Sequence, residues 1–370
     1  MIARDVRFPL VDALRAIAAL SIVAYHLAFL LGGFDLDVAG RWLARLNVGV
    51  PLFFAISGFL LYRPWAAARL AGEPPPSARR YAVRRALRIL PAYWLALSVI
   101  ALLAGRSDVF SWPGALVHYG LFQGYDAGRF TGGIGPAWTL SIEVTFYVLL
   151  PLLALAMRRV AGGLRGELAM LVVLVAISLA FKAAVLALAD GNAPAYLVLL
   201  AALPAQLDMF AAGMALAVLR VAGIGRAGGW WWLVALAAFS LLGLWTPAAD
   251  APRVLGEHAL QTVVAVSLLI PAVLAEREGG AVRRLLAWRP LAWVGLISYG
   301  LYLWHLDAIR QLVDADLPAP VVIVAGTAAS IALGAASWYA LERYALRLGH
   351  PRRREPRPAE PVPATSGSRG

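Results

Sequence analysis

Ten long apolar segments, separated by short polar or charged ones, make up most of this 370-residue chain. They lie roughly at residues 10–31, 47–68, 87–104, 136–157, 167–189, 195–219, 230–247, 254–275, 291–313 and 319–341. Each is close to the length that a helix needs to cross a bilayer, and none alternates strictly as a barrel strand does. Because lipid offers the backbone no hydrogen-bond partner, such segments must be helices. The pattern predicts an all-α, polytopic membrane bundle of about ten transmembrane helices.

The composition supports this prediction. Apolar residues make up 61% of the chain, charged residues only 15%, and the mean hydropathy is +0.73, all unlike a water-soluble domain. Cysteine is absent, which excludes disulfides, thiol nucleophiles, zinc–thiolate sites and iron–sulfur clusters. We expect no metal site, and any catalysis must use other groups.

The net charge of +12 is unevenly placed along the chain. If the segments cross alternately, 25 of the 33 Lys and Arg fall on the side of the N-terminus. The positive-inside rule then predicts that both termini are cytoplasmic. This basic excess is expected to face anionic membrane lipids, and no nucleic-acid partner is expected. The first apolar segment contains Asp12 and Arg15, so it is predicted to remain as a helix and not to be cleaved as a signal peptide.

Two domains are predicted. Residues 1–345 form the transmembrane domain, and residues 346–370, rich in Pro, Arg and Glu, form a disordered cytoplasmic tail. The longest outer loop, residues 105–135, is rich in aromatic residues and is expected to fold back toward the bundle.

The first segment carries two residues that a bilayer tolerates poorly, Arg15 and His26. Eleven residues of helix separate them by about 16.5 Å and return them to nearly the same face. Arg15 can instead form a structural pair with Asp12 or extend its side chain to the membrane surface, and His26 can simply bond a neighbouring helix.

Two further ionisable residues, Glu143 and His305, are predicted at about the depth of His26, some 20 to 24 Å above the inner helix ends. An imidazole beside a carboxylate is the usual arrangement of a general base, because the carboxylate orients the ring. The sequence therefore predicts His26 and Glu143 as catalytic residues. For His305, a helix–helix hydrogen bond is an equally good interpretation.

Three arginines, Arg84, Arg85 and Arg88, stand where the third segment begins, on the same side of the membrane as Arg15. A cluster of guanidinium groups favours a phosphate-rich ligand. Alternatively, some of these arginines serve only to fix the orientation of the helices in the membrane. Acyl-coenzyme A combines a polyanionic head with a long thin arm. We predict that these four arginines bind this donor and that one continuous tunnel leads its thioester to His26.

Other polar residues are candidates for binding the second substrate. Trp138 and Ser141, at helical spacing near the outer surface, are predicted as a sugar platform. Ser298, Tyr302 and His305 share a face of the ninth segment, and Tyr302 and His305 are also predicted to bind substrate. The Ser57-Gly58-Phe59 sequence is predicted to be a small-residue packing seam.

Taken together, five blocks of the sequence resemble the acyltransferase-3 family of membrane O-acyltransferases, in the family's order between residues 10 and about 343. The blocks are VDALRAIAALSIVAYH, GVPLFFAISGFLL, RRALRILPAYW, WTLSIEVTFYVLLPLL and ISYGLYLWH. The resemblance implies transfer of an acyl group, most often acetyl, from cytoplasmic acyl-coenzyme A. The implied acceptor is a carbohydrate-type hydroxyl at the outer side of the bacterial inner membrane.

By position, the resemblance makes His26 the catalytic histidine, Arg15 its partner, Arg85 and Arg88 the cytoplasmic arginine pair and Glu143 the acidic residue. The chain departs from the family pattern at Val144, where a second Glu is common. Some relatives carry a fused esterase-like domain, and a relay to such a domain is expected to need another protein here.

The predicted function is acyl transfer in which His26 serves as general base or first takes the acyl group itself. Acceptors compatible with the sequence are surface polysaccharide, peptidoglycan, a glycolipid and a glycosylated metabolite of the macrolide type. The alternative is a proton-coupled transporter or flippase for a lipid-linked or anionic sugar, although no paired inverted repeats are evident. A membrane sensor or scaffold would leave the buried charges without a purpose.

Overall fold

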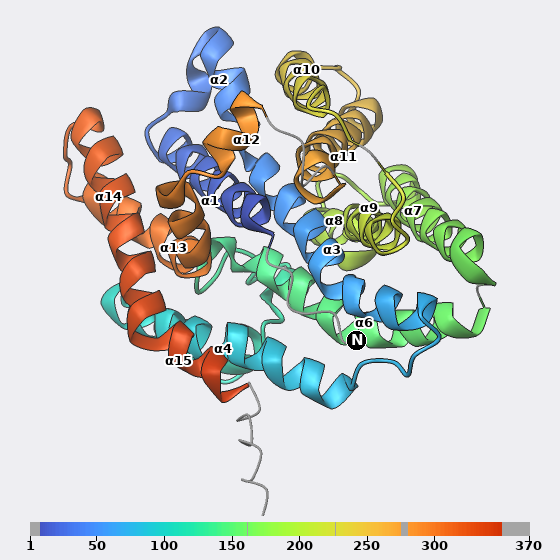
Figure 1. The fold of residues 1–370 in the computed structure, drawn as a ribbon. Helices are drawn as coiled ribbons and strands as arrows, with labels where there is room; N and C mark the ends of the chain where they lie inside the picture. The colour runs from blue at the N-terminus through green and yellow to red at the C-terminus, as the bar shows by residue number, and fades with distance from the viewer. Residues whose placement is uncertain (1–7, 161, 226, 275–279, 350–370) are drawn as a thin grey trace, which may run out of the picture.

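The computed structural model describes residues 8–160, 162–225, 227–274 and 280–349, and these residues contain helices and no strand. The longer helices are α1 (Pro9–Leu30), α3 (Gly49–Leu70), α4 (Ala78–Leu103), α6 (Trp138–Val160), α7 (Gly163–Leu188), α9 (Leu203–Val221), α10 (Trp231–Leu244), α11 (Asp250–Leu274), α13 (Arg289–Asp314) and α14 (Ala319–Ser337) (Figure 1). The shorter ones are α2 (Asp37–Leu43), α5 (Gly114–Tyr119), α8 (Pro194–Ala201), α12 (Ala281–Leu286) and α15 (Arg343–Leu348). The predicted all-α bundle is confirmed. The predicted tail at residues 350–370 lies outside the described residues.

Eight helical stretches of the described chain are long and apolar enough to cross a membrane. They are Leu10–Leu30, Asp37–Leu70, Ala78–Leu103, Gly135–Val160, Gly163–Leu188, Pro194–Val221, Asp250–Leu274 and Ala319–Leu348. The other two predicted segments are also helical but do not qualify. Helix α10 has only 14 residues, and α13 includes charged residues such as Asp307 and Arg310. The protein is therefore a polytopic membrane bundle with eight clear membrane helices and two further helices packed among them.

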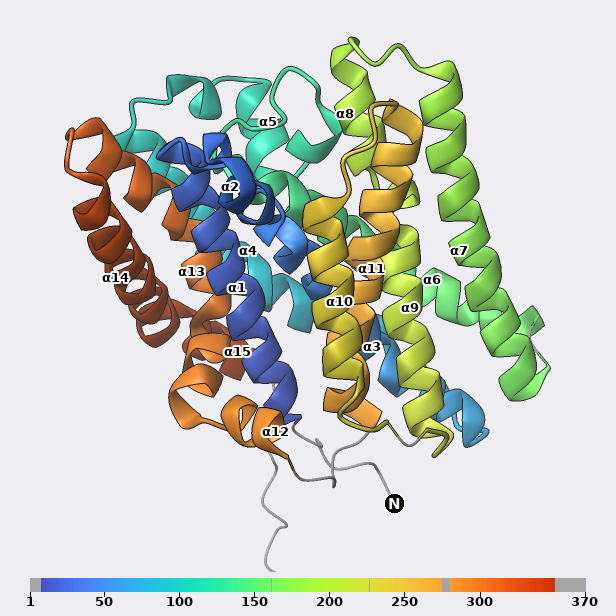
Figure 2. The same ribbon diagram turned by 90° about the horizontal axis from the view of Figure 1, so that it is seen from above.

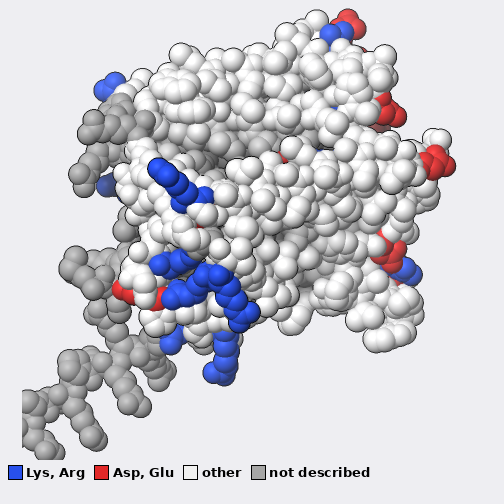
Figure 3. All heavy atoms as spheres, turned by 90° about the vertical axis from the view of Figure 1, so that its right-hand side faces the viewer, with Lys and Arg blue, Asp and Glu red and all other residues white. Residues whose placement is uncertain are grey.

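Charge is separated along the bundle. Figure 2 shows α2, α5 and α8 at one end and α12 at the opposite end, with the long helices running between them. On the face drawn in Figure 3, most Lys and Arg gather at one end, most Asp and Glu lie at the other, and a wide uncharged band separates them. This is the distribution expected of a protein that spans a bilayer.

Glycines allow the central helices to pack at backbone distance. A Cβ added to Gly58 of α3 would lie 2.2 Å from the carbonyl oxygen of Phe210 in α9, and one added to Gly213 of α9 would lie 2.0 Å from that of Ala55. The packing seam predicted around Gly58 is confirmed. Likewise, a Cβ on Gly295 of α13 would lie 1.8 Å from the carbonyl oxygen of Asp12 in α1. This second close approach aligns α1 with α13 and brings the polar faces of the two helices together.

We expect Gly58→Ala to destabilise the protein by about 1 to 3 kcal/mol, because the added methyl group must push α3 away from α9. Thermal unfolding of the purified protein in detergent measures the effect. Gly191→Ala is the matched control, since its Cβ would meet nothing within 4 Å. Equal stability of the two variants would contradict the close packing of α3 on α9.

The outer loop folds back onto the bundle, as predicted. Tyr93 of α4 donates a hydrogen bond to the carbonyl oxygen of His118 (2.7 Å) and accepts one from the Gln123 side chain (3.0 Å). Arg106 donates to the carbonyl oxygen of Gly133 and forms an ion pair with Asp307 of α13 at 2.5 Å. The loop is thereby fixed above the helices and forms part of a cavity wall.

Candidate active site

Two cavities meet inside the bundle. The arginine cavity, of about 100 Å³, lies among α1, α3, α4, α6 and α13, and its lining includes Arg15, Ser57, Arg85, Arg88 and Glu143. The histidine cavity, of about 680 Å³, is lined by parts of α1, α3, α6, α9, α11, α13 and the outer loop, and it includes His26, Trp138, Gln206, His258 and Arg310. Val50, Thr139 and Tyr302 line both.

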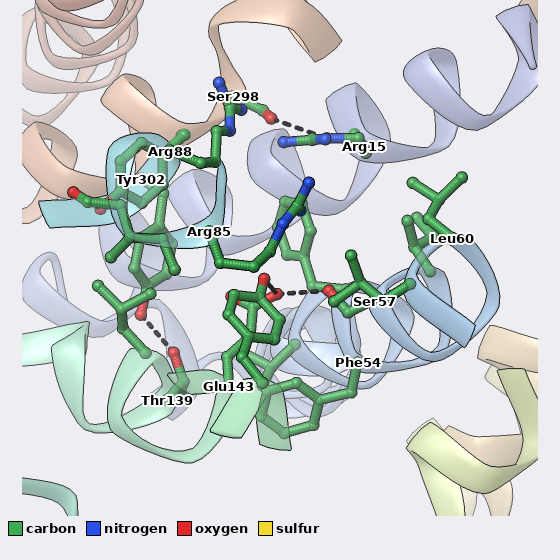
Figure 4. Close-up of a pocket in the computed structure, with 18 residues that line it drawn as sticks. Arg15, Phe54, Ser57, Leu60, Arg85, Arg88, Thr139, Glu143, Ser298 and Tyr302 are labelled. Atoms are coloured by element: carbon green, nitrogen blue, oxygen red, sulfur yellow. Dashed lines mark hydrogen bonds between the residues drawn. The ribbon is translucent and has the colours of Figure 1, made fainter. Parts of the chain in front are cut away.

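These three shared residues form a partition between the cavities. The hydroxyl groups of Thr139 on α6 and Tyr302 on α13 lie 2.5 Å apart, and Tyr302 also donates to the carbonyl oxygen of Pro136. Figure 4 shows the Thr139–Tyr302 bond at the edge of the arginine cavity. The expected single tunnel is not seen: the described residues line two cavities, and the hydrogen-bonded side chains of Thr139 and Tyr302 stand where these adjoin.

Three of the predicted donor-binding arginines converge in the arginine cavity. Arg15 donates to the hydroxyl of Ser298 (3.4 Å), and Arg88 pairs with the buried carboxylate of Glu342 (3.2 Å). Arg85 forms no ion pair among the described residues. Its guanidinium carbon lies over the ring of Tyr147, 6.0 Å from the ring centroid. In Figure 4 the side chains of Arg15 and Arg85 approach the same space. This space is positively charged and has a guanidinium available for an anion.

Arg84 lies elsewhere. It donates to the carbonyl oxygen of Gly349 at 3.5 Å and is not part of the cavity lining. Successive residues of a helix point about 100° apart, so Arg84 faces the end of α15 while Arg85 faces the cavity. The structure thus separates Arg84 from the other predicted donor-binding residues.

Glu143 is not the partner of His26. Its carboxylate accepts hydrogen bonds from Ser57 and from the hydroxyl of Tyr147 (2.5 Å), inside the arginine cavity. His26 lines the other cavity, on the far side of the partition. The sequence placed the two residues at one depth, but equal depth does not put two side chains in one cavity. The role predicted for Glu143 is corrected accordingly, since this carboxylate faces the arginines.

The partner of His26 is a second histidine. His305 Nδ1 lies 2.8 Å from the carbonyl oxygen of Tyr302, which can only accept, so this nitrogen carries the hydrogen. In the neutral ring its Nε2 is then an acceptor, 3.0 Å from Nδ1 of His26. Nδ1 of His26 also lies 3.0 Å from the carbonyl oxygen of Ile22. Two acceptors thus hold the hydrogen on Nδ1 of His26 and leave its Nε2 unprotonated.

The predicted substrate-binding residues divide into two groups. Trp138 and Tyr302 line the histidine cavity, and Trp138 stacks on Phe130 of the outer loop with the ring centroids 5.1 Å apart. His305 is completely buried behind His26, and Ser141 is buried and accepts a hydrogen bond from the backbone of Gly124 (3.2 Å). Neither residue lines the arginine cavity or the histidine cavity. His305 therefore orients His26, and Ser141 fastens the outer loop to α6.

Several polar residues of the histidine cavity were not predicted from the sequence. They are Asn47, Arg106, Gln206, His258, Gln261 and Arg310. His258 is backed by Asp208 of α9, and both residues stand within apolar segments. The high cost of an ionisable side chain in a membrane segment was the signal that could have found this pair.

His118 lies beneath the part of the outer loop that lines the histidine cavity. Its ring is fully buried, and neither nitrogen has a hydrogen-bond partner among the described residues. A Cβ on Gly132 would lie 2.8 Å from the ring, so the loop packs directly on it. Burial lowers the pKa of His118, and the Asp108 carboxylate, 3.9 Å away, opposes this shift only in part.

We expect His118 to make the protein less stable in acid. A histidine of the unfolded chain takes up a proton as the pH falls through about 6.5, whereas the buried ring does so only at lower pH. The stabilisation is therefore complete above the unfolded pKa and is lost as the pH falls below it. Thermal unfolding in detergent between pH 7.5 and 5.5, compared with His118→Gln, measures the difference. Parallel pH dependence in the two proteins would contradict this role.

Comparison with known proteins identifies the chain. The acyltransferase-3 family model, described as an acyltransferase domain, matches residues 8–339. The chain belongs to this family. Its helical bundle is therefore an acyltransferase domain, and this match supports neither the transporter nor the scaffold alternative. No solved structure matches this acyltransferase.

Named relatives of this acyltransferase are distant. ExoZ of Rhizobium meliloti (strain 1021), an exopolysaccharide production protein, is 29% identical over 82% of this chain and 91% of its own. YrhL of Bacillus subtilis (strain 168), named for peptidoglycan O-acetylation, is 26% identical over 81% of this chain and 48% of its own. The peptidoglycan O-acetyltransferase OatA of Listeria monocytogenes is 22% identical over 81% and 49%. The chain thus spans about half the length of the two peptidoglycan-related proteins.

Proposed function

We propose that this acyltransferase moves an acetyl group from cytoplasmic acyl-coenzyme A to a hydroxyl of a carbohydrate-type acceptor at the outer side of the bacterial inner membrane. The observation that carries the proposal is the pair of cavities, one lined by arginines and one by His26, which meet at a shared partition. Such an arrangement brings an anionic donor and a neutral acceptor to the same point from opposite sides.

The arginine cavity is the proposed donor site. At about 100 Å³ it is too small for a complete coenzyme A, since drug-sized ligands occupy roughly 300 to 1,000 Å³. We therefore place only the thioester end of the pantetheine arm inside it, with Arg15, Arg85 and Arg88 drawing the phosphates to its mouth. The positive-inside rule supports a cytoplasmic mouth, because the segments on this side hold most of the Lys and Arg.

The histidine cavity is the proposed acceptor site. Its volume of about 680 Å³ is sufficient for a sugar, and amide side chains (Asn47, Gln206, Gln261) and Trp138 supply the hydrogen bonds and apolar face that a sugar needs. The names of ExoZ and OatA support a polysaccharide or peptidoglycan acceptor. A glycolipid or a glycosylated metabolite fits the same chemistry.

His26 is the proposed reacting residue. Its unprotonated Nε2 can take the proton of the acceptor hydroxyl while the oxygen attacks the thioester carbon, the carbon–sulfur bond breaks and the coenzyme A thiolate leaves. Alternatively Nε2 itself attacks and carries the acyl group. In both versions the thioester must pass between Thr139 and Tyr302, so the proposal requires the partition to open when the donor binds.

The experiment has two parts. Mass spectrometry of envelope glycans and small metabolites, from cells with and without the protein, should show a mass difference of one acetyl group. Inverted membrane vesicles, which expose the cytoplasmic face, should consume added acetyl-coenzyme A, whereas right-side-out vesicles should not. Consumption by neither kind of vesicle would overturn the proposed donor, and consumption only by right-side-out vesicles would overturn its sidedness.

A further inference from the structure

A buried polar cluster behind the wall of the histidine cavity joins three helices. Asp208 of α9 accepts hydrogen bonds from Ser178 (3.0 Å) and Lys182 (3.2 Å) of α7 and from His258 of α11 (2.9 Å). The three ionisable residues of this cluster are at most 8% exposed. Burial of such groups is costly unless they are paired and hydrogen-bonded.

The partners of Asp208 determine the state of His258. Lys182 balances the carboxylate charge, so a neutral imidazole leaves the cluster with no net charge in its apolar surroundings. The carboxylate can only accept, and both of its oxygens lie 2.9 Å from Nε2 of His258. The ring hydrogen is therefore on Nε2, and Nδ1 bears the free lone pair.

His258 is more than a structural member of this cluster. A purely structural group would have its polar atoms satisfied within the cluster, but the cluster bonds only Nε2 of His258, and no hydrogen bond of Nδ1 is found among the described residues. The residue also lines the histidine cavity, to which His26 contributes from α1. A carboxylate that fixes a histidine tautomer and stabilises its imidazolium is the arrangement of a general base.

We propose that His258, positioned by Asp208, is a second base of this enzyme, which takes the proton of the acceptor hydroxyl while His26 handles the acyl group. The proposal rests on the function proposed above. In the first step Nε2 of His26 attacks the thioester, a carbon–nitrogen bond forms, the carbon–sulfur bond breaks and the thiolate of coenzyme A leaves. In the second, Nδ1 of His258 removes the hydroxyl proton, the oxygen bonds to the acyl carbon and the carbon–nitrogen bond breaks.

The test compares acceptors that do and do not need a base. Release of coenzyme A from acetyl-coenzyme A is followed in nanodiscs with glycerol at molar concentration, with water alone, or with hydroxylamine, whose nitrogen is nucleophilic at neutral pH without deprotonation. We expect His258→Gln to slow the glycerol and water reactions by about 10²- to 10³-fold and to keep the hydroxylamine reaction near the wild-type rate. Unchanged rates with glycerol and water would overturn the proposal, as would equal losses with all three probes.

A control separates this result from failure of the proposed function. If the wild-type protein releases no coenzyme A with any probe, the acyl-transfer function itself is wrong. Binding of acetyl-coenzyme A by His258→Gln checks its folding, because the donor cavity lies beyond the partition. Should this variant fail to bind the donor, the next variant decides.

Lys182→Met gives an independent measurement. The substitution removes the ammonium group that lies 3.2 Å from Asp208. The carboxylate then has only the imidazolium of His258 to stabilise, so the acidic limb of the pH–rate profile should move to higher pH. The other ionisable groups around the ring stay unchanged. Tyr25, His26, Arg106, Asp108 and Arg310 line the same cavity, and Glu257, the residue before His258 in the chain, pairs with Arg45 at 2.5 Å. An even loss of rate at all pH values would show a merely structural cluster and overturn the proposal.

Discussion

Replacing His26 by alanine should lower the rate of acyl transfer by at least about 10²- to 10⁴-fold, the usual contribution of a positioned acid–base group. The variant loses an imidazole that lines the histidine cavity and whose Nε2 is left unprotonated by the two bonds of Nδ1. Affinity for acyl-coenzyme A should stay near the wild-type value, because the arginines lie beyond Thr139 and Tyr302. Donor binding and transfer of labelled acetyl groups by the purified variant measure the two effects.

A graded control comes from the residue behind His26. His305→Ala removes the acceptor that holds the hydrogen on Nδ1 of His26. In His305→Gln, the side-chain carbonyl of the glutamine can still accept a hydrogen bond from Nδ1 of His26. We expect the glutamine variant to retain more activity than the alanine variant. Wild-type transfer by His26→Ala would rule out both the general-base and the acyl-carrier version of the mechanism.

The fold could be predicted largely from hydrophobicity, because in lipid a long apolar segment has no alternative to a helix. Helices α10 and α13 show the limit of this reasoning. A helix such as α13 is held by its neighbours as well as by lipid, so it tolerates Asp307, which pairs with Arg106 from the outer loop. Length and apolarity of one segment do not reveal such partners from a distant part of the chain.

The site could be predicted in part. Helical spacing placed Arg15 and His26 on one face, and the structure brings each of them to a partner on α13, Ser298 and His305. Spacing within one helix cannot say which cavity a neighbouring helix faces, which is why Glu143 was paired with the wrong residue. Asp208 was overlooked because its partners, Lys182 and His258, lie on two other helices, and the sequence does not show that these helices are neighbours.

Arg85→Ala should weaken binding of acyl-coenzyme A by about 10- to 100-fold, the loss expected for one charge-assisted hydrogen bond to phosphate. Among the described residues its guanidinium has no carboxylate partner, so its charge is available to the donor. Arg88 would be a less clear test, because its removal would also leave the buried Glu342 without its ion pair. Isothermal titration of the protein in nanodiscs with acetyl-coenzyme A gives the affinity.

Arg84→Ala is the matched control, since it removes the same charge from the neighbouring position of the same helix. Arg84 bonds the carbonyl oxygen of Gly349 and faces away from the arginine cavity, so its loss should change donor affinity little. If general attraction between the basic end of the bundle and the anionic donor were responsible, the two variants would weaken binding equally and salt would abolish the effect. Equal losses would therefore reject a specific contact of Arg85 with the donor and leave only the net charge of that surface.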